Sequence, residues 1–138
     1  PVIFTKIFRL SDKDNFQILS IKLFEESAKV LPQILKDFIE GKLKPKPQDH
    51  LKANYTKIIT KEDGYFDLSN PPSPEKLDRM IRAYYFWPTA WTKWNNKIVK
   101  LLPRDMVQME GKKPVKIEEF LRGYPNFPDL SHQSHKLQ

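Results

Sequence analysis

The 138-residue sequence contains no cysteine, which excludes disulfides, thiolate zinc sites and a cysteine nucleophile. Glycine is also scarce, and four scattered glycines do not form a Gly-rich phosphate-binding loop. No apolar run approaches the roughly 20 residues that a membrane helix needs. The chain begins Pro1-Val2-Ile3-Phe4, without Met or a basic signal-peptide region. We therefore expect a cytoplasmic fragment without a membrane partner.

Histidine is nearly as rare, since the chain has only His50, His132 and His135. A catalytic His needs a packed shell that holds it rigidly. His50 falls in a stretch without periodicity, and the other two fall in a polar tail. The i, i+3 spacing in the tail is compatible only with weak metal binding. We therefore expect no catalytic residue and no metal site in this chain.

Positive charge is plentiful: 24 Lys and Arg face 17 Asp and Glu, giving a net charge of +7. The cations gather in two stretches, 42–61 and 93–116, where acids are few. Lysines near phosphates release counterions, so such clusters favour nucleic-acid binding, although ordinary surface lysine is the simpler alternative. The stretch 93–116 also contains Lys100, Arg104 and Lys116. The candidate RNA-binding residues are Lys42, Lys44, Lys46, Lys52, Lys57, Lys61, Lys93, Lys97, Lys112 and Lys113.

The first half of the chain predicts one strand and one long helix. Residues 1–8 are apolar on both faces of a strand, as in a covered sheet, so we expect missing upstream chain. Asp14 is the expected N-cap of a helix that Pro32 bends or splits and Gly41 ends. The stretch 42–55, rich in Lys and Pro, predicts an extended linker.

The second half predicts short elements. A strand is expected at 57–60, followed by a turn at 61–64. Ser73-Pro74-Glu75 predicts a helix start. Residues 91–102 predict a hairpin that turns at Asn95-Asn96. A strand at 106–109 and a helix at 117–122, closed by Gly123, follow, and the chain is expected to be loose from Pro125 onward.

Two side chains in this half carry specific expectations. The aromatics around Tyr84–Pro88, Trp91 and Trp94 suit core packing or base stacking. Trp94, beside the hairpin turn, is the expected exposed one. Arg82 is expected to anchor its helix to a carboxylate such as Asp67.

Five segments resemble methionyl-tRNA formyltransferases, in order and with consistent spacing over about the first 125 residues. They are PKPQD at 45–49, TKEDGYFD at 60–67, NPPSPEKLDRMIRAYYFWPTA at 70–90, EGKKP at 110–114 and FLRGY at 120–124. The family pattern for these segments is P-x-P-Q-D, K-E-D-G-x-I-D, a helix with I-R-A and W-P-G-A, E-G-K-K and F-L-R-G-Y. Residues 1–41 are similar, more loosely, to the last strand and helix of the family's transferase domain.

The sequence departs from the family pattern at three places. Leu68 stands where the family has Trp, Thr89 where it has Gly, and Tyr85-Phe86 where it commonly has Asn-Pro. The family's C-terminal domain is an open β-barrel of the oligonucleotide-binding type. Too few residues separate the hairpin from Glu110 for all of its strands, so the resemblance implies a reduced barrel.

The resemblance implies a parent enzyme that moves a formyl group from 10-formyltetrahydrofolate to the amino group of methionine on initiator tRNA. The family uses an Asn, a His and an Asp, whose positions lie before Pro1. This segment alone is therefore expected to be inactive and to bind no cofactor. Its expected partners are initiator methionyl-tRNA and an upstream catalytic domain, and it is expected to be a monomer.

The expected fold class is α+β, combining a strand-helix remnant of an α/β formyltransferase domain with a small OB-like β domain that has a short helix. The expected boundaries are 1–41 for the edge of the formyltransferase domain, 42–55 for a basic linker, 56–125 for the shortened C-terminal domain and 126–138 for a flexible tail. Two alternatives stay open. One is the C-terminal part of a sugar-nucleotide N-formyltransferase, and the other is a non-enzymatic RNA-binding adaptor.

Overall fold

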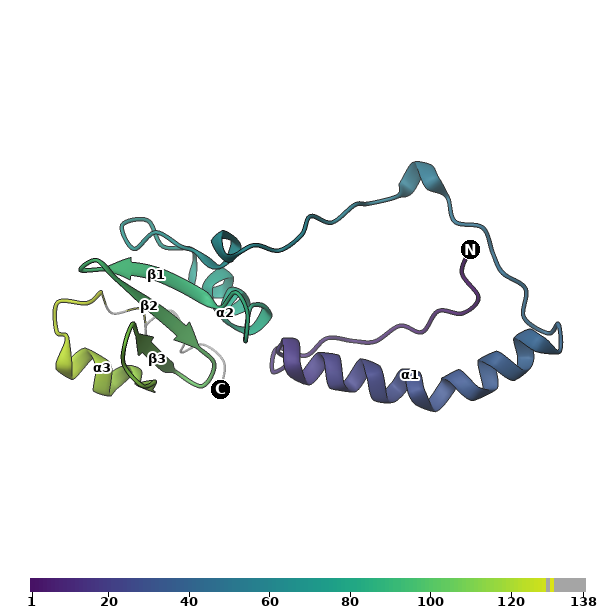
Figure 1. Ribbon diagram of the computed structural model, residues 1–138, viewed down its shortest axis with the longest axis horizontal. Coiled ribbons are helices and arrows are strands. Elements are labelled where there is room, and N and C mark those ends of the chain that lie inside the picture. The colour runs from purple at the N-terminus through teal and green to yellow at the C-terminus, as the bar shows by residue number, and fades with distance from the viewer. Residues whose placement is uncertain (129, 131–138) are drawn as a thin grey trace. The chain divides into compact units, whose positions relative to one another are not determined.

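The computed structural model describes residues 1–128 and 130 (Figure 1). The chain divides into two compact units, Pro1–Ile58 and Ile59–Gln138. The first unit is dominated by one long helix, and the second contains a four-stranded antiparallel sheet with two shorter helices. The α+β class expected from the sequence is thus confirmed.

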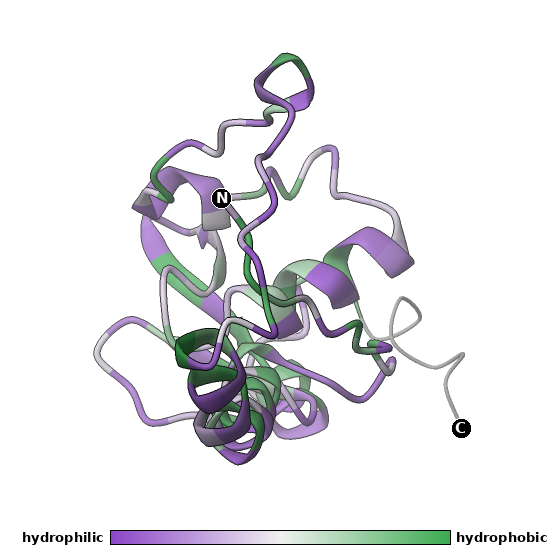
Figure 2. Ribbon diagram, turned by 90° about the vertical axis from the view of Figure 1, so that its right-hand side faces the viewer, coloured by the Kyte–Doolittle hydropathy of each residue, from purple (hydrophilic) through white to green (hydrophobic). Residues whose placement is uncertain are grey.

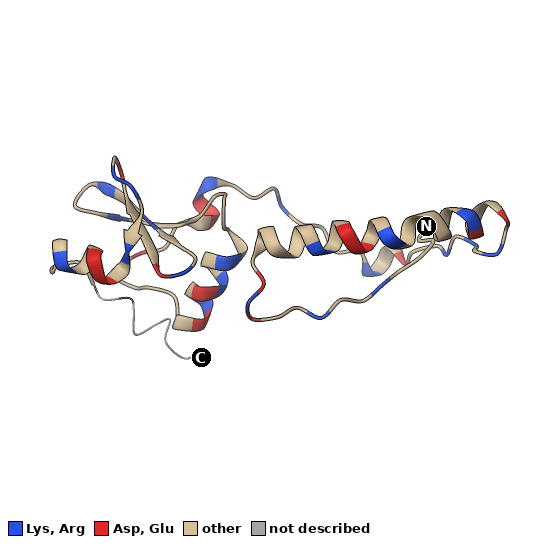
Figure 3. Ribbon diagram, turned by 90° about the horizontal axis from the view of Figure 1, so that it is seen from below, with Lys and Arg blue, Asp and Glu red and all other residues tan. Residues whose placement is uncertain are grey.

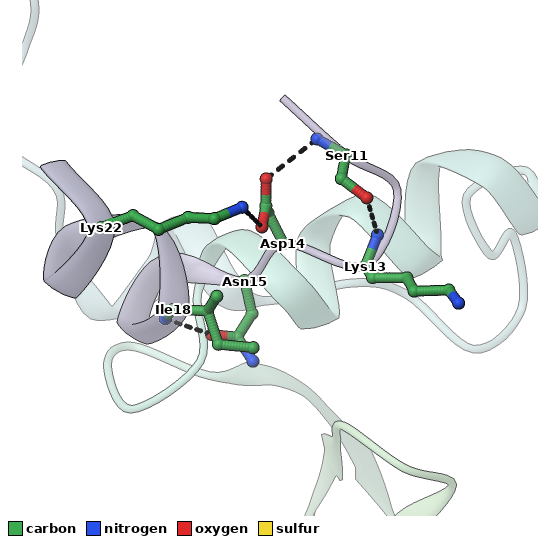
Figure 4. A network of polar contacts seen from close by, with 6 residues as sticks. All are labelled: Ser11, Lys13, Asp14, Asn15, Ile18 and Lys22. Carbon is green, nitrogen blue, oxygen red and sulfur yellow. Dashed lines mark hydrogen bonds and ion pairs between the residues drawn. The ribbon is translucent and has the colours of Figure 1, made fainter. Parts of the chain in front are cut away.

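The long helix of the first unit, α1 (Phe16–Ile39), begins at Asn15 instead of Asp14. Asn15 Oδ1 accepts a hydrogen bond from the Ile18 backbone N–H at 2.9 Å. The Asp14 carboxylate is buried and already accepts hydrogen bonds from the Ser11 N–H at 2.9 Å and from Lys22 Nζ at 3.0 Å (Figure 4). The predicted cap was therefore wrong by one residue, because its carboxylate closes the preceding turn instead.

Pro32 lies inside α1 without splitting it, and the helix bends along its length (Figure 1). The helix ends as predicted, with Glu40 as C-cap and Gly41 following at a φ of +73°. That left-handed conformation favours glycine. Glu26 of α1 pairs with Lys29 at 2.6 Å and with Lys6 of the N-terminal segment at 2.8 Å. These hydrogen bonds, Lys29 first, lower the pKa of Glu26 to about 2.

The expected strand at 1–8 is wrong for the described chain. Only Val2 is paired, through one antiparallel bridge to Lys46 with N···O distances of 2.8 and 2.9 Å. A strand needs a neighbour along its length, and the described part of this unit supplies one residue pair. Apolar side chains of α1 are likewise not buried, and several are exposed, among them Phe16, Phe24 and Ile39. Figure 2, which looks roughly along the axis of α1, shows both hydrophobic and hydrophilic residues on this helix.

The sheet of the second unit has the strand order β1-β2-β3-β4, with antiparallel neighbours. Its strands are β1 (Ala90–Trp94), β2 (Lys97–Leu102), β3 (Met106–Met109) and β4 (Val115–Lys116). The predicted hairpin is confirmed, because Asn95 and Asn96 turn with φ values of 48° and 61°. Two positive φ values in succession are those of a type I′ turn. The sheet is open, with β1 and β4 at its edges.

Both helices of this unit begin at the predicted positions. Helix α2 (Pro74–Ala83) is capped by Ser73, and helix α3 (Ile117–Gly123) follows β4 directly. The expected strand at 57–60 is wrong. The chain there leads into a 3-10 turn, η2 (Lys61–Gly64), with a capping box between Thr60 and Asp63. Another short 3-10 turn, η1 (His50–Lys52), interrupts the expected linker.

The hydrophobic core lies against one face of the sheet. Ala90, Val99, Leu101, Val107 and Met109 of the strands pack with side chains from α2 and α3, including Leu77 and Phe120. Trp94 joins this core, with its ring edge-on to Tyr124 and Phe127 at centroid distances of 5.6 and 5.4 Å. The prediction that Trp94 is exposed was wrong, because alternation along β1 puts it on the same face as Ala90 and Thr92.

The packed core also extends past the expected start of the loose tail. Phe127 and Leu130 are both buried among its members. Their large apolar side chains give the chain after α3 a reason to fold back onto the core. His132 and His135 lie outside the described residues.

Candidate nucleic-acid interface

The face of the sheet opposite the core carries a straight row of three side chains. Trp91 of β1 is paired with Lys100 of β2, which is paired with Gln108 of β3. Side chains of directly opposed residues lie on the same face, close enough to interact. The row therefore joins an aromatic ring, a cation and an amide.

A second row runs parallel to the first. Lys93 is paired with Ile98, whose backbone N–H donates to the Glu110 carboxylate at 3.0 Å. The Ile98 carbonyl in turn accepts from the Glu110 N–H at 2.8 Å. These two hydrogen bonds fix Glu110 beside Ile98 of β2.

Lys61 reaches this face from the loop that precedes the sheet. The Trp91 ring N–H donates to the Lys61 carbonyl at 2.9 Å, and Lys61 Nζ lies 5.3 Å from the Trp91 ring centroid. The Tyr65 ring also packs against the Trp91 ring, with 4.9 Å between the two ring centroids. A cation this close to an indole face is attracted to it, so the loop and strand are fixed together.

These residues surround a groove of about 410 Å³. It is lined by Lys61, Trp87, Pro88, Trp91, Ile98, Lys100, Gln108, Met109, Glu110 and Gly111. Two cations face one carboxylate, Glu110. Trp87 is 59% exposed, which is high for so large an apolar side chain. The groove combines aromatic surface with net positive charge, a combination that suits nucleic-acid ligands.

The ten lysines proposed from the sequence divide evenly between the two units, and all ten are exposed. Figure 3 shows Lys and Arg spread over both units. In the first unit, Lys42 pairs with Glu40 at 2.6 Å, and Lys52 pairs with Asp49 at 3.5 Å. The first unit holds Lys42, Lys44, Lys46, Lys52 and Lys57, and the second holds Lys61, Lys93, Lys97, Lys112 and Lys113.

The lysines of the second unit do not share one surface. Lys61 lines the groove, and Lys93 lies on the same face of the sheet. Lys97 is paired with Trp94 and so lies on the core side. Lys112 donates to the Tyr124 hydroxyl at 2.7 Å, beside α3. Only part of the predicted set therefore contributes to the groove.

Of the residues that line the groove, only Lys61 was among the predicted site residues, and Trp87, Lys100 and Gln108 are among those left out. The signal for two of them was present. Val99, Leu101, Val107 and Met109 alternate as core residues, so Lys100 and Gln108 had to share the opposite face. Trp87 follows α2 in a loop, where no periodicity reports its exposure.

A second cavity, of about 510 Å³, lies beside α2, with Asp63, Asp67, Lys76 and Tyr84 among its lining residues. Its carboxylates have local structural roles. The Ser69 backbone N–H and hydroxyl donate to Asp67 and lower its pKa. Arg82, expected to anchor at Asp67, donates from Nε to Asp78 at 2.8 Å.

Within residues 1–128 and 130, no group of three or more His, Asp or Glu side chains is arranged to hold a metal ion. His50 lies exposed in η1. Within the same residues, no helix has the length and apolar character needed to cross a membrane.

Comparison with known proteins supports the family resemblance. Residues 58–107 match the family model described as "Formyl transferase, C-terminal domain". The methionyl-tRNA formyltransferase of Chloroflexus aurantiacus (strain ATCC 29366 / DSM 635 / J-10-fl) is 37% identical over 93 residues, which cover 67% of this chain and 29% of that protein. That of Caldanaerobacter subterraneus subsp. tengcongensis is 34% identical over 105 residues, covering 76% and 33%.

A third relative shows the same relationship. The methionyl-tRNA formyltransferase of Roseiflexus castenholzii is 33% identical over 102 residues, covering 74% of this chain and 32% of that protein. The chain thus spans about a third of the length of the curated relatives it matches. The residues that match the family model, 58–107, include the hairpin of β1 and β2 and the groove residues Lys61 and Trp87. The chain is therefore homologous to the C-terminal region of methionyl-tRNA formyltransferases.

Proposed function

We propose that this chain is the tRNA-binding and positioning portion of a methionyl-tRNA formyltransferase. The observation that carries the proposal is the groove on the free face of the sheet, where Lys61 and Lys100 lie beside Trp87 and Trp91. Phosphates of a tRNA backbone would be neutralised by these cations and by Lys93 on the same face. In this proposal the C-terminal region holds the tRNA while an upstream catalytic domain performs the transfer.

The chemistry belongs to the whole protein in this proposal. There, a formyl group passes from 10-formyltetrahydrofolate to the methionine amino group of initiator tRNA. We assign no residue of this chain to the formyl donor, and the chain alone is expected to be inactive. We also propose that the open sheet is a reduced form of an OB-like barrel, and that residues 1–41 form the edge of a formyltransferase domain.

The test is the affinity of the chain for initiator tRNA, measured across a range of salt concentrations. Counterion release predicts that log Kd rises linearly with log salt, with a slope of about 0.9 per phosphate contact on a duplex. Three contacts, from Lys61, Lys93 and Lys100, would therefore give a slope of roughly 2.7. A flat response would contradict the proposal. An equally tight, salt-independent complex with an amino-sugar nucleotide would favour the sugar-nucleotide enzymes instead.

A further inference from the structure

We propose that the groove receives one unpaired nucleotide, with its base stacked on Trp87 and its phosphate beside Lys61 and Lys100. This inference rests on the proposed RNA-binding function and adds the kind of RNA that the site prefers. It predicts a preference for single-stranded segments over double helix.

The exposed ring is Trp87. An indole with 59% of its surface in water exposes a large apolar area. The other tryptophans of the unit are covered, because Trp91 is 8% exposed and Trp94 belongs to the core. Base stacking on an aromatic ring contributes substantially and is tolerant of sequence, since every base has a π-face. Trp87 therefore offers an exposed stacking surface among the residues that line the groove.

The loop that carries Trp87 is held at both sides. The Thr89 N–H donates to the Tyr84 carbonyl at 2.9 Å, and the Phe66 N–H donates to the Trp91 carbonyl at 3.0 Å. Gly64 lies against this loop so closely that an added Cβ would be 2.0 Å from the Thr89 carbonyl oxygen. A stacking ring on a fixed loop loses little freedom on binding, which favours affinity.

The polar groups of the groove suit a nucleotide better than a bare phosphate. Lys61 and Lys100 outnumber the one carboxylate, so the groove favours an anion. Gln108 and Glu110 add an amide and a carboxylate, the groups that hydrogen-bond to base edges. Gln108 Nε2 donates to the Lys112 carbonyl at 3.0 Å, which fixes the orientation of its amide. A cavity of about 410 Å³ is also in the range of small-ligand sites.

A double helix presents its phosphates but keeps its bases stacked inside. Lys61, Lys93 and Lys100 would attract both forms, whereas Trp87 would engage only a base that is free of its neighbours. Stacking and charge are therefore separable by experiment, because stacking is insensitive to salt and phosphate contacts are not.

The experiment compares Trp87→Ala with Phe86→Ala in the full chain. Phe86 is an ideal control, since it is the adjacent residue, is also 59% exposed, and is not among the residues that line the groove. Affinities are measured for a 12-nucleotide single-stranded RNA and for a blunt RNA duplex of the same length. We expect Trp87→Ala to weaken single-strand binding about 5- to 150-fold, the loss of one stacked base, with an unchanged salt slope.

The two other substitutions are expected to change RNA affinity only slightly. Phe86→Ala should leave both affinities within about twofold, and Trp87→Phe should retain most of the single-strand affinity. Far-UV circular dichroism and melting temperature verify that each variant is folded. Equal single-strand affinities for Trp87→Ala and Phe86→Ala, with normal wild-type binding, would overturn the stacking inference alone. A wild-type chain that binds neither RNA at low salt would overturn the proposed function as well.

Discussion

Single residues determine how closely the loops of the second unit approach each other. Gly64 is buried in η2, and a Cβ built on it would lie 2.0 Å from the Thr89 carbonyl oxygen and 3.1 Å from Pro88 Cγ. The first distance involves backbone, so a flexible side chain cannot move aside to relieve it. Hydrogen is therefore the side chain that fits at this position.

Gly64→Ala is expected to destabilise the chain by about 2 kcal/mol or more, the range of a buried steric conflict. Gly123→Ala is the matched control, because no atom lies within 4 Å of its added Cβ. It should be neutral, or stabilise by about 0.5 kcal/mol through the unfolded state. Urea unfolding of both variants measures the difference. Equal free energies of unfolding would contradict the close approach.

Thr89 shows why one departure from the family pattern is unusual. Its φ of 67° is in the left-handed region, where a β-branched residue is strained and glycine is not. The sequence alone marked Thr89 as a replacement for Gly but gave no sign of this backbone conformation. Trp94 was predicted to be exposed because it adjoins the hairpin turn. Alternation along β1 instead puts it on the core side of the sheet.

At the scale of elements, short sequence motifs correctly predicted where a helix begins and where the hairpin turns in the second unit. Ser73-Pro74 and Asn95-Asn96 each have a conformational reason to begin or turn an element, and the structure agrees at both. Helix α3 also ends at Gly123, but without the positive φ that would favour glycine there. Elements that depend on distant partners were not predictable in the same way. Residues 1–8 have a strand pattern, but they form a single bridge within the described chain.

The hairpin turn provides the element-scale prediction. Asn95 and Asn96 both have positive φ, a conformation that asparagine tolerates and alanine disfavours. Replacing both by Ala should lower the free energy of unfolding by about 1–2 kcal/mol, while Asn96→Gly should not lower it. Thermal or urea unfolding measures both variants. A double-Ala variant as stable as wild type would exclude the type I′ turn.

At the scale of the whole molecule, the two units differ in how they are stabilised. All the buried hydrophobic residues of the described chain belong to the second unit, whereas α1 has no buried residue. Most of the stability of a protein helix comes from tertiary packing of its apolar face. The two-part organisation was visible from the sequence, as a change from helical periodicity to Lys- and Pro-rich chain. The sequence did not predict that α1 would have no buried residue within the described part of the chain.

Amide hydrogen exchange on the 138-residue chain should reveal this difference. Amides of Val99 and Leu101 in β2 are expected to exchange only by unfolding of the second unit, and so to be the slowest. Amides in the middle of α1 should exchange orders of magnitude faster. Equal protection in α1 and β2 would mean that the helix is covered by something other than its own unit.

The arrangement of charge also belongs to this scale. Lysine clustering along the sequence indicated a polyanion partner, but clustering along a chain does not decide which cations face the same way. Strand pairing puts Lys93 and Lys100 on one face, where Lys61 joins them from η2. Lys97 lies on the opposite face, and Lys112 contacts Tyr124. We propose that this face binds the tRNA backbone.

The most direct measurement of that claim is the salt dependence of tRNA affinity for Lys61→Gln/Lys100→Gln, beside Lys13→Gln/Lys36→Gln as a control with the same loss of charge. The groove variant should bind more weakly, and its slope of log Kd against log salt should fall by roughly 1.4–1.8, for two lost phosphate contacts. The control should keep nearly the wild-type slope. If both variants lose the same amount, or neither loses any, the groove is not where the RNA backbone binds.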